Sequence, residues 1–208
     1  ESRPEQVEMA RAVTAAVENG EHLAVEAGTG VGKSLAYLLP SVLHVIRTGG
    51  KVMISTNTIN LQEQLTGKDV EITRAVLAEF GESPDQMRAA QLKGRANYLC
   101  FKRWQNAVLH TEPNDTESKV LSKILVWLKQ TETGDRNELA LGRLIPMFTR
   151  YSAQGAAMCP SNEGPCFLRK ARNQASGSNV VIINHALLMS DIAMGGGLLP
   201  DHDVLIID

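Results

Sequence analysis

The sequence predicts an α/β fold in which helices cover a parallel sheet. Short runs of aliphatic and β-branched residues occur at 22–26, 51–56, 180–183 and 204–207. Such runs are typical of strands buried on both faces, as in a parallel sheet with crossover helices. Between them, apolar residues recur at helical spacing. Residues 93–168 lack this alternation and hold all three cysteines and both tryptophans, so we predict an insertion there.

The first predicted helix begins near Ser2 and Pro4 and ends at Gly20. Proline is favoured in the first turn of a helix, and glycine is favoured just after its end. The buried stripe of this helix consists of Val7, Ala10, Val13 and Val17. A strand over residues 22–26 follows it.

Residues 27–34 read AGTGVGKS, a glycine-rich loop between the predicted strand and a helix whose apolar face runs from Leu35 to Ile46. Glycines let successive N–H groups point at phosphate oxygens, and the helix N-terminus adds positive potential. Lys33 would reach the β and γ phosphates of ATP, and the Ser34 hydroxyl would ligate Mg²⁺. A turn that binds nothing is disfavoured because both flanking elements are present. The ATP-binding residues predicted in this loop are Ala27, Gly28, Thr29, Gly30, Val31, Gly32, Lys33 and Ser34.

Polar residues follow the second strand, and the chain then enters a helix near residues 61–65. Thr56 and Asn57 stand at the carboxyl end of that strand, where hydroxyl and amide side chains can bind sugar–phosphate without reading bases. Ordinary helix capping would also account for the pair.

The last strand, residues 204–207, ends in Asp208 and looks like a Walker B strand. The aspartate of such a strand orients the metal ion that bridges ATP phosphates. We therefore predict Lys33 and Asp208 as catalytic residues, and Ser34 and Asp208 as Mg²⁺ ligands. An Asn–His pair after the strand at 180–183 leaves two roles open for His185: support of a nucleotide or nucleic-acid site, or a hydrogen-bonded interior histidine.

The insertion carries two basic clusters beside cysteines, although the whole chain has a net charge of −2. Such clusters could meet a phosphate backbone, and a solvated surface is the alternative. The predicted contacts are Lys93, Arg95, Lys102 and Arg103 around Cys100, with Arg169 and Lys170 after Cys166. We place the domain boundaries at 1–92, 93–168 and 169–208.

Composition narrows the class of protein further. Hydrophobic residues make up 43% of the 208, enough for a core. No apolar run approaches the roughly 18 residues needed to cross a bilayer, and no basic-then-apolar leader opens the chain. Three cysteines do not form an even disulfide framework. We expect a cytoplasmic protein without a membrane partner, whose cysteines are thiols or metal ligands.

Seven segments, taken in order, resemble a known family. The N-terminal one, residues 3–6, is similar to an adenine-recognising motif, and residues 27–34 and 55–65 are similar to helicase motifs I and Ia. The others are residues 93–100, 127–135, 166–172 and 184–188. Together they resemble the front part of a superfamily 2 DNA helicase of the DinG/XPD type, which carries an iron–sulfur cluster.

The resemblance implies a RecA-like P-loop NTPase sheet with an inserted, mostly helical domain that bears the cluster or a vestige of it. It implies an ATP-dependent DNA helicase, a monomeric motor that moves 5′ to 3′ on single-stranded DNA and unwinds forked DNA, alone or in a repair complex. Arg3 and Gln6 would contact adenine, and Thr56 and Asn57 would grip the DNA backbone. Further motif residues should follow Asp208, and a second RecA-like domain should supply an arginine finger. We therefore expect residues 1–208 alone not to turn ATP over.

The cysteines depart from the family pattern. A [4Fe–4S] cluster is usually held by four thiolates, and this chain offers Cys100, Cys159 and Cys166. The position of the missing cysteine falls near residues 154–155. A cluster with another ligand, a different metal, a vestigial domain without iron, and plain free thiols all stay open. Vestigial cluster domains occur in DinG-like helicases of type IV CRISPR systems, which adds a CRISPR effector complex to the partners considered.

Two rival functions belong to other classes. A P-loop phosphotransferase acting on a small molecule would hydrolyse or transfer phosphate without regard to DNA. A non-catalytic module that senses nucleotide or metal and binds DNA would show no DNA-stimulated hydrolysis.

Overall fold

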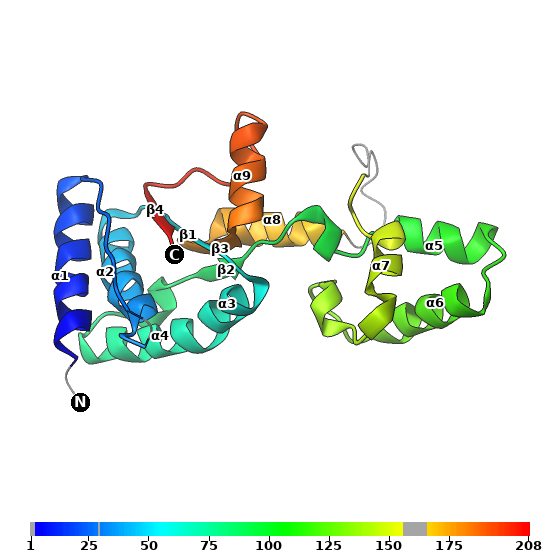
Figure 1. Ribbon diagram of the computed structural model, residues 1–208, viewed down its shortest axis with the longest axis horizontal. Helices are drawn as coiled ribbons and strands as arrows, with labels where there is room; N and C mark the ends of the chain where they lie inside the picture. The colour runs from blue at the N-terminus through cyan, green and yellow to red at the C-terminus, as the bar shows by residue number, and fades with distance from the viewer. Residues whose placement is uncertain (1–2, 29, 156–165) are drawn as a thin grey trace. The chain divides into compact units, whose positions relative to one another are not determined.

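A computed structural model describes residues 3–28, 30–155 and 166–208 of the chain (Figure 1). The chain divides into two compact units. The first comprises residues 1–92 and 174–208, and the second comprises residues 93–173. The division falls within α8 (Phe167–Gly177).

The first unit is built on a sheet with the strand order β2-β3-β1-β4, in which every neighbouring pair is parallel. The strands are β1 (Val52–Thr56), β2 (Ala89–Gln91), β3 (Val180–Asn184) and β4 (Val204–Ile207). All of β1 and most of β3 is buried, as continuous aliphatic runs indicate. The α/β prediction and three of its four strands are confirmed.

The helices of the first unit are α1 (Pro4–Asn19), α2 (Lys33–Thr48), α3 (Ile59–Gln64), α4 (Val70–Glu79) and α9 (His185–Ala193), with a π-helical segment at Leu65–Asp69 between α3 and α4. Of these, α1, α2 and α4 share one apolar core with the sheet. Val13 of α1, Leu38 of α2 and Ile182 of β3 belong to the same buried cluster. α1 begins at Pro4 and ends at Gly20, as predicted, and the Gly20 N–H donates to Ala16 O.

The predicted strand at residues 22–26 is wrong in this structure. Residues 21–28 have no strand assignment, and the side chains of Leu23 and Val25 are 45% and 42% exposed. An apolar run becomes a strand only where another backbone offers hydrogen-bond partners. Among the described residues, β4 pairs with β1 alone, so the other edge of β4 has no neighbouring strand.

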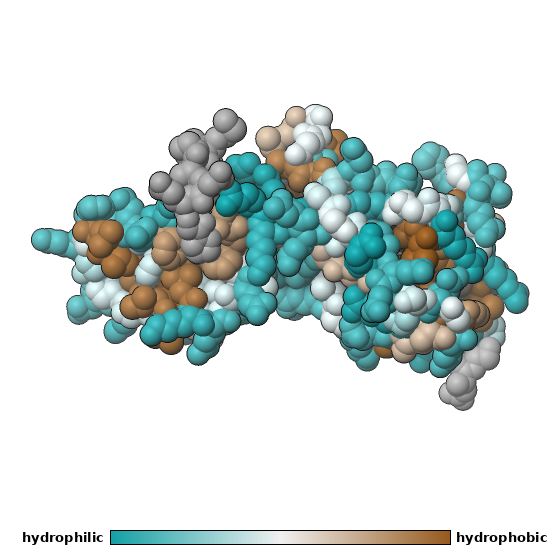
Figure 2. All heavy atoms as spheres, turned by 180° about the vertical axis from the view of Figure 1, so that it is seen from behind, coloured by the Kyte–Doolittle hydropathy of each residue, from teal (hydrophilic) through white to brown (hydrophobic). Residues whose placement is uncertain are grey.

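α9 leaves the sheet at the end of β3 and projects from the first unit (Figure 1). Asn184 caps it, because its Oδ1 accepts from Leu187 N at 2.9 Å. Met189, Ile192 and Met194 are exposed on and just after this helix, and Figure 2 shows an apolar surface there. No described helix is long and apolar enough to span a bilayer.

A buried glutamine joins α3 to the sheet. Gln62 has no exposed surface, and its Nε2 donates to Leu92 O and Ile182 O, both at 2.9 Å. The two carbonyls belong to the end of β2 and to β3, so one amide group ties the helix to two neighbouring strands.

The second unit is mostly helical. It contains α5 (Phe101–His110), α6 (Asp115–Trp127) and the short α7 (Ile145–Phe148), joined by 3₁₀ turns. α6 starts with a capping box in which Asn114 and Glu117 bond each other's backbone N–H groups. Its buried residues include Leu121 and Ile124.

Tyr98 lies in the interior of the second unit, where its hydroxyl accepts from Lys93 N at 3.0 Å. Burial raises the pKa of Tyr98 to about 12, and the nearby Asp135 charge acts in the same direction. The Lys93 ammonium group donates to Asp135 Oδ2 at 2.5 Å, and both residues are buried.

Replacing Gln62 with alanine is expected to lower the free energy of unfolding by about 1–3 kcal/mol, because buried carbonyls lose their donor. The matched control is Gln64→Ala in the same helix, where the side chain is exposed. That change should stay within about 0.5 kcal/mol. Urea denaturation of the two variants makes the comparison, and equal losses would contradict the role given to Gln62.

Tyr98 also predicts an alkaline limit to stability. Its pKa is near 10 in an unfolded chain and about 12 in the folded one, so the folded state holds the proton more tightly. The contribution of Tyr98 to the free energy of unfolding is complete below pH 10 and falls as the pH rises towards 12. The test is urea denaturation of the wild type and of Tyr98→Phe from pH 8 to pH 12. The difference between the two free energies of unfolding isolates the contribution of Tyr98, because the lysines titrate alike in both proteins. Parallel curves for the two proteins would exclude it.

Candidate nucleotide site

The loop at residues 27–34 curls at the start of α2. Gly30 and Gly32 have φ values of +83° and +88°, a region that side chains with a Cβ rarely adopt. Gly32 is the residue before the helix, so the first N–H groups of α2 have no partner within the helix. Thr29 lies outside the described residues. The conformation leaves N–H groups at a helix N-terminus, which is the part of a helix that binds anions.

Lys33 is the first residue of α2, and its ammonium group turns back onto the loop. Nζ donates to Ala27 O at 3.1 Å and lies 3.5 Å from Gly28 O. These partners are neutral carbonyls, which a phosphate group with formal charge can replace.

Two side chains from the start of α1 hold the loop from outside. Arg3 Nη1 donates to Gly30 O and Gln6 Nε2 donates to Gly32 O, both at 2.9 Å. A Cβ at Gly32 would lie 2.3 Å from Gln6 Nε2. Both predicted adenine-binding residues are therefore brought to the loop, although the groups that they contact are backbone carbonyls.

Asp208 follows β4 at the carboxyl edge of the sheet. Its N–H donates to Ser55 O at 2.9 Å, which continues the ladder between β4 and β1. Its Oδ2 accepts from the Tyr37 hydroxyl at 3.0 Å. Burial, and then the charge of Asp208, raise the pKa of Tyr37 well above its ordinary value. Tyr37 and Ser34 both belong to α2, so this bond ties Asp208 to the helix that carries the other predicted Mg²⁺ ligand.

Tyr37 was missed by the sequence reasoning. It lies three residues after Ser34, so both side chains share one face of α2, and this spacing was a usable signal. The oxygen atoms of Ser34 and Asp208 suit Mg²⁺, which prefers oxygen ligands.

The two residues predicted to contact DNA at the end of β1 differ in exposure. Thr56 is fully buried, and its hydroxyl donates to Thr58 O at 3.2 Å. The predicted contact of Thr56 with the DNA backbone is therefore wrong in this structure. Thr58 caps α3 by accepting from Leu61 N. Asn57 is exposed.

His185 is half-buried at the same edge of the sheet. Its Nδ1 lies 2.7 Å from the Ser55 hydroxyl oxygen, and Ser55 is fully buried. This hydrogen bond agrees with a structural role for the histidine.

The basic residues of the second unit that were predicted to contact DNA also differ in exposure. Lys93 is only 2% exposed and is paired with Asp135, which removes it from the surface and corrects its predicted DNA contact. Arg103 donates to Ser152 O at 3.0 Å and also to Gln154 O, and Lys170 donates to Glu132 O at 2.9 Å. The other five have exposed or half-buried side chains and stay predictions: Arg95, Lys102, Arg103, Arg169 and Lys170.

Two of the three cysteines meet in the second unit. Cys100 and Cys166 pair across an isolated antiparallel bridge, and both are free thiols. Cys159 lies outside the described residues. Among residues 3–28, 30–155 and 166–208, three or more His, Cys, Asp or Glu side chains do not gather as a metal site. With three cysteines in the whole chain, the thiols present do not fit a [4Fe–4S] cluster held by four of them.

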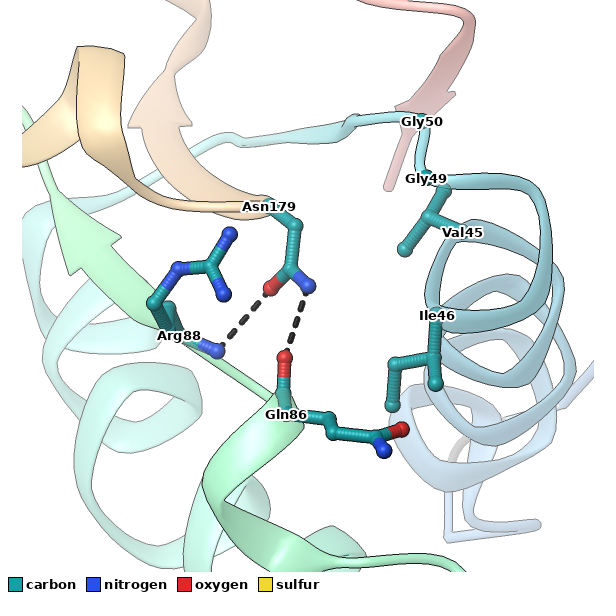
Figure 3. A pocket seen from close by; sticks show the side chains of 7 residues that line it. All are labelled: Val45, Ile46, Gly49, Gly50, Gln86, Arg88 and Asn179. Carbon is teal, nitrogen blue, oxygen red and sulfur yellow. Dashed lines mark hydrogen bonds between the residues drawn. The ribbon is translucent and has the colours of Figure 1, made fainter.

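A pocket of about 220 Å³ lies at the opposite, amino edge of the sheet (Figure 3). It is lined by Val45, Ile46, Gly49, Gly50, Gln86, Arg88 and Asn179. Asn179 donates to Gln86 O at 2.7 Å and accepts from Arg88 N at 2.9 Å, as Figure 3 shows. These bonds hold the segments before β2 and β3 together. Since the strands are parallel, this pocket is separate from the loop and from Asp208.

Replacing Gly32 with alanine should distort the loop, because the new methyl group adds a collision with Gln6 to the strain of a positive φ. The control is Gly20→Ala, which has a φ of +69° and no atom within 4 Å of its Cβ position. We expect the control to lose about 1–2 kcal/mol and Gly32→Ala to lose more. Adding Gln6→Ala to Gly32→Ala should recover part of the difference. Equal losses in urea denaturation for the two glycine variants would refute the close contact.

The chain resembles known proteins along almost its whole length. Residues 5–124 match the family described as DEAD/DEAH box helicase. The chain is 36% identical to the ATP-dependent helicase DinG of Mycobacterium tuberculosis (strain ATCC 25177 / H37Ra), over 98% of the chain and 33% of that protein. It is 36% identical to the ATP-dependent DNA helicase YoaA of Escherichia coli (strain K12), over 99% and 32%. It is also 36% identical to the 3′-5′ exonuclease DinG of Bacillus subtilis (strain 168), over 100% and 22%. The chain thus spans about a third or less of the length of these relatives.

Proposed function

Because the chain belongs to the DEAD/DEAH box helicase family, we propose that the protein to which it belongs is an ATP-dependent DNA helicase. The observation that carries this proposal is the hydrogen bond that ties Asp208, at the carboxyl edge of the sheet, to Tyr37 of α2, the helix that the loop at residues 27–34 opens. In parallel α/β sheets, ligands bind outside the carboxyl ends of the strands. The relatives named DinG and YoaA as ATP-dependent helicases support the same activity.

In this proposal the loop binds the triphosphate of ATP. Backbone N–H groups around Gly30 and Gly32 would point at phosphate oxygens, and the Lys33 ammonium group would leave Ala27 O for the β and γ phosphates. Its positive charge would then stabilise the negative charge that develops during hydrolysis. Arg3 and Gln6 hold the outside of the loop and would contact the adenine base.

Ser34 and Asp208 would hold Mg²⁺, which when bound neutralises charge on the phosphates. Their oxygen atoms fit a hard cation, as the chemistry of Mg²⁺ requires. Catalysis needs a water-activating group and a second nucleotide-binding wall as well, and we assign these to parts of the full protein beyond the residues described.

Single-stranded DNA is the proposed track of the motor. Asn57 is exposed at the carboxyl end of β1 and would contact the DNA backbone. Further candidates are Arg95, Lys102, Arg103, Arg169 and Lys170. The 5′ to 3′ direction of movement is proposed from the resemblance to DinG/XPD-type helicases alone.

We further propose that residues 93–168 form a domain inserted into a RecA-like domain made of residues 1–92 and 169–208. The compact second unit, which also begins at residue 93, supports this division. A mostly helical insertion could separate the strands of a duplex while ATP hydrolysis moves the DNA. No step in this proposal depends on iron, because the cysteines do not fit a four-thiolate cluster.

Replacing Lys33 with alanine in the full-length protein should lower the ATP hydrolysis rate at least about 100-fold and abolish unwinding, because a phosphate-binding charge is lost. The thermal unfolding temperature should be unchanged. Lys68→Ala is the control, since Lys68 is exposed in the π-helical segment. A coupled assay with and without single-stranded DNA measures both variants.

The same assay distinguishes the rival functions. Stimulation of the wild type by single-stranded DNA supports the helicase. Hydrolysis that ignores DNA would favour a phosphotransferase, and no hydrolysis at all by the full-length protein would favour a sensing module.

A further inference from the structure

We propose that Tyr37 is a positioning residue, which orients Asp208 for Mg²⁺ before the metal binds. This inference rests on the proposed nucleotide site and adds a residue to it. The Tyr37 hydroxyl donates to Asp208 Oδ2 at 3.0 Å. Tyr37 belongs to α2, which also carries Ser34, and Asp208 follows β4, so a single hydroxyl joins the two elements that must meet for the metal to bind.

The direction of this hydrogen bond follows from the chemistry of the groups. An ionised carboxylate only accepts, so the Tyr37 hydroxyl is the donor and Asp208 Oδ2 the acceptor. A phenol has one hydrogen, and the bond to Asp208 uses it.

This arrangement leaves one oxygen of Asp208 ready for a cation. Asp208 uses Oδ2 for Tyr37, which leaves Oδ1 for the metal or for one of its waters. Mg²⁺ demands near-ideal octahedral geometry, so ligands already held in place bind it at lower concentration.

The packing around Tyr37 holds its ring, and therefore its hydroxyl, in a fixed position. Its side chain is 3% exposed and belongs to the apolar core with Leu38 and Val42. The backbone of Asp208 is held independently by its bond to Ser55 O. A phenylalanine would preserve the packing of the ring and remove only the hydroxyl, so the two roles of Tyr37 can be separated by experiment.

The test uses Tyr37→Phe in the full-length protein and a fluorescent ADP analogue as the probe. Binding is titrated over a range of Mg²⁺ concentrations and again with the metal chelated. We expect the Mg²⁺ concentration for half-maximal binding to rise about tenfold, the effect of one hydrogen bond to a charged group. Binding without the metal should be unchanged. The control is Tyr98→Phe, a buried tyrosine with the same 3% exposure in the other unit, which should leave the Mg²⁺ dependence as in the wild type.

A second variant keeps the test decisive if Tyr37→Phe loses stability. In an Asp208→Asn background, Tyr37→Phe should shift the Mg²⁺ dependence much less than it does in the wild type, because the group that it positions has lost its charge. An equal shift in both backgrounds would overturn the inference. So would an unchanged Mg²⁺ dependence in Tyr37→Phe, or an equal loss of binding with and without the metal. If the wild type bound the nucleotide without any effect of Mg²⁺, the proposed nucleotide site itself would fail.

Discussion

The parallel register between β1 and β4 is the constraint on which the candidate site depends. Val52 aligns with Val204, and the ladder continues to the bond from Asp208 N to Ser55 O. This register brings a residue 175 positions after Lys33, at Asp208, to the same edge of the sheet as the start of α2. A slip of one residue would turn the Asp208 side chain to the other face of the sheet. The contact with Tyr37 would then be lost.

Buried polar groups do much to define both units. In the first unit, the amide of Gln62 and the hydroxyl of Tyr37 each join a helix to the sheet. In the second unit, the buried polar contact is the ion pair between Lys93 and Asp135. Removing one member of a buried pair leaves an uncompensated charge and is strongly destabilising, whereas the net contribution of the intact pair is small. Such groups select one arrangement of the elements more than they add stability.

The sequence predicted the fold class well, and it failed where burial decides. Aliphatic runs became β1, β3 and β4 because each has a neighbour that completes its hydrogen bonds. The shorter apolar run at residues 22–26 did not, since hydrophobicity says nothing about the availability of a partner. Thr56 and Lys93 failed for a related reason. Their polarity suggested a surface, but their side chains are satisfied inside the protein.

By itself, the sequence determined that a glycine-rich loop opens a helix, that aliphatic strands form a parallel sheet, and that three thiols are too few for a four-cysteine cluster. These properties depend on residue type and on local spacing, which a linear pattern records. Only the tertiary structure decided that the Tyr37 hydroxyl meets Asp208, and that Gln6 supports Gly32 from another helix. Those contacts join residues far apart in the chain, and their existence depends on register and packing, which are properties of the folded whole.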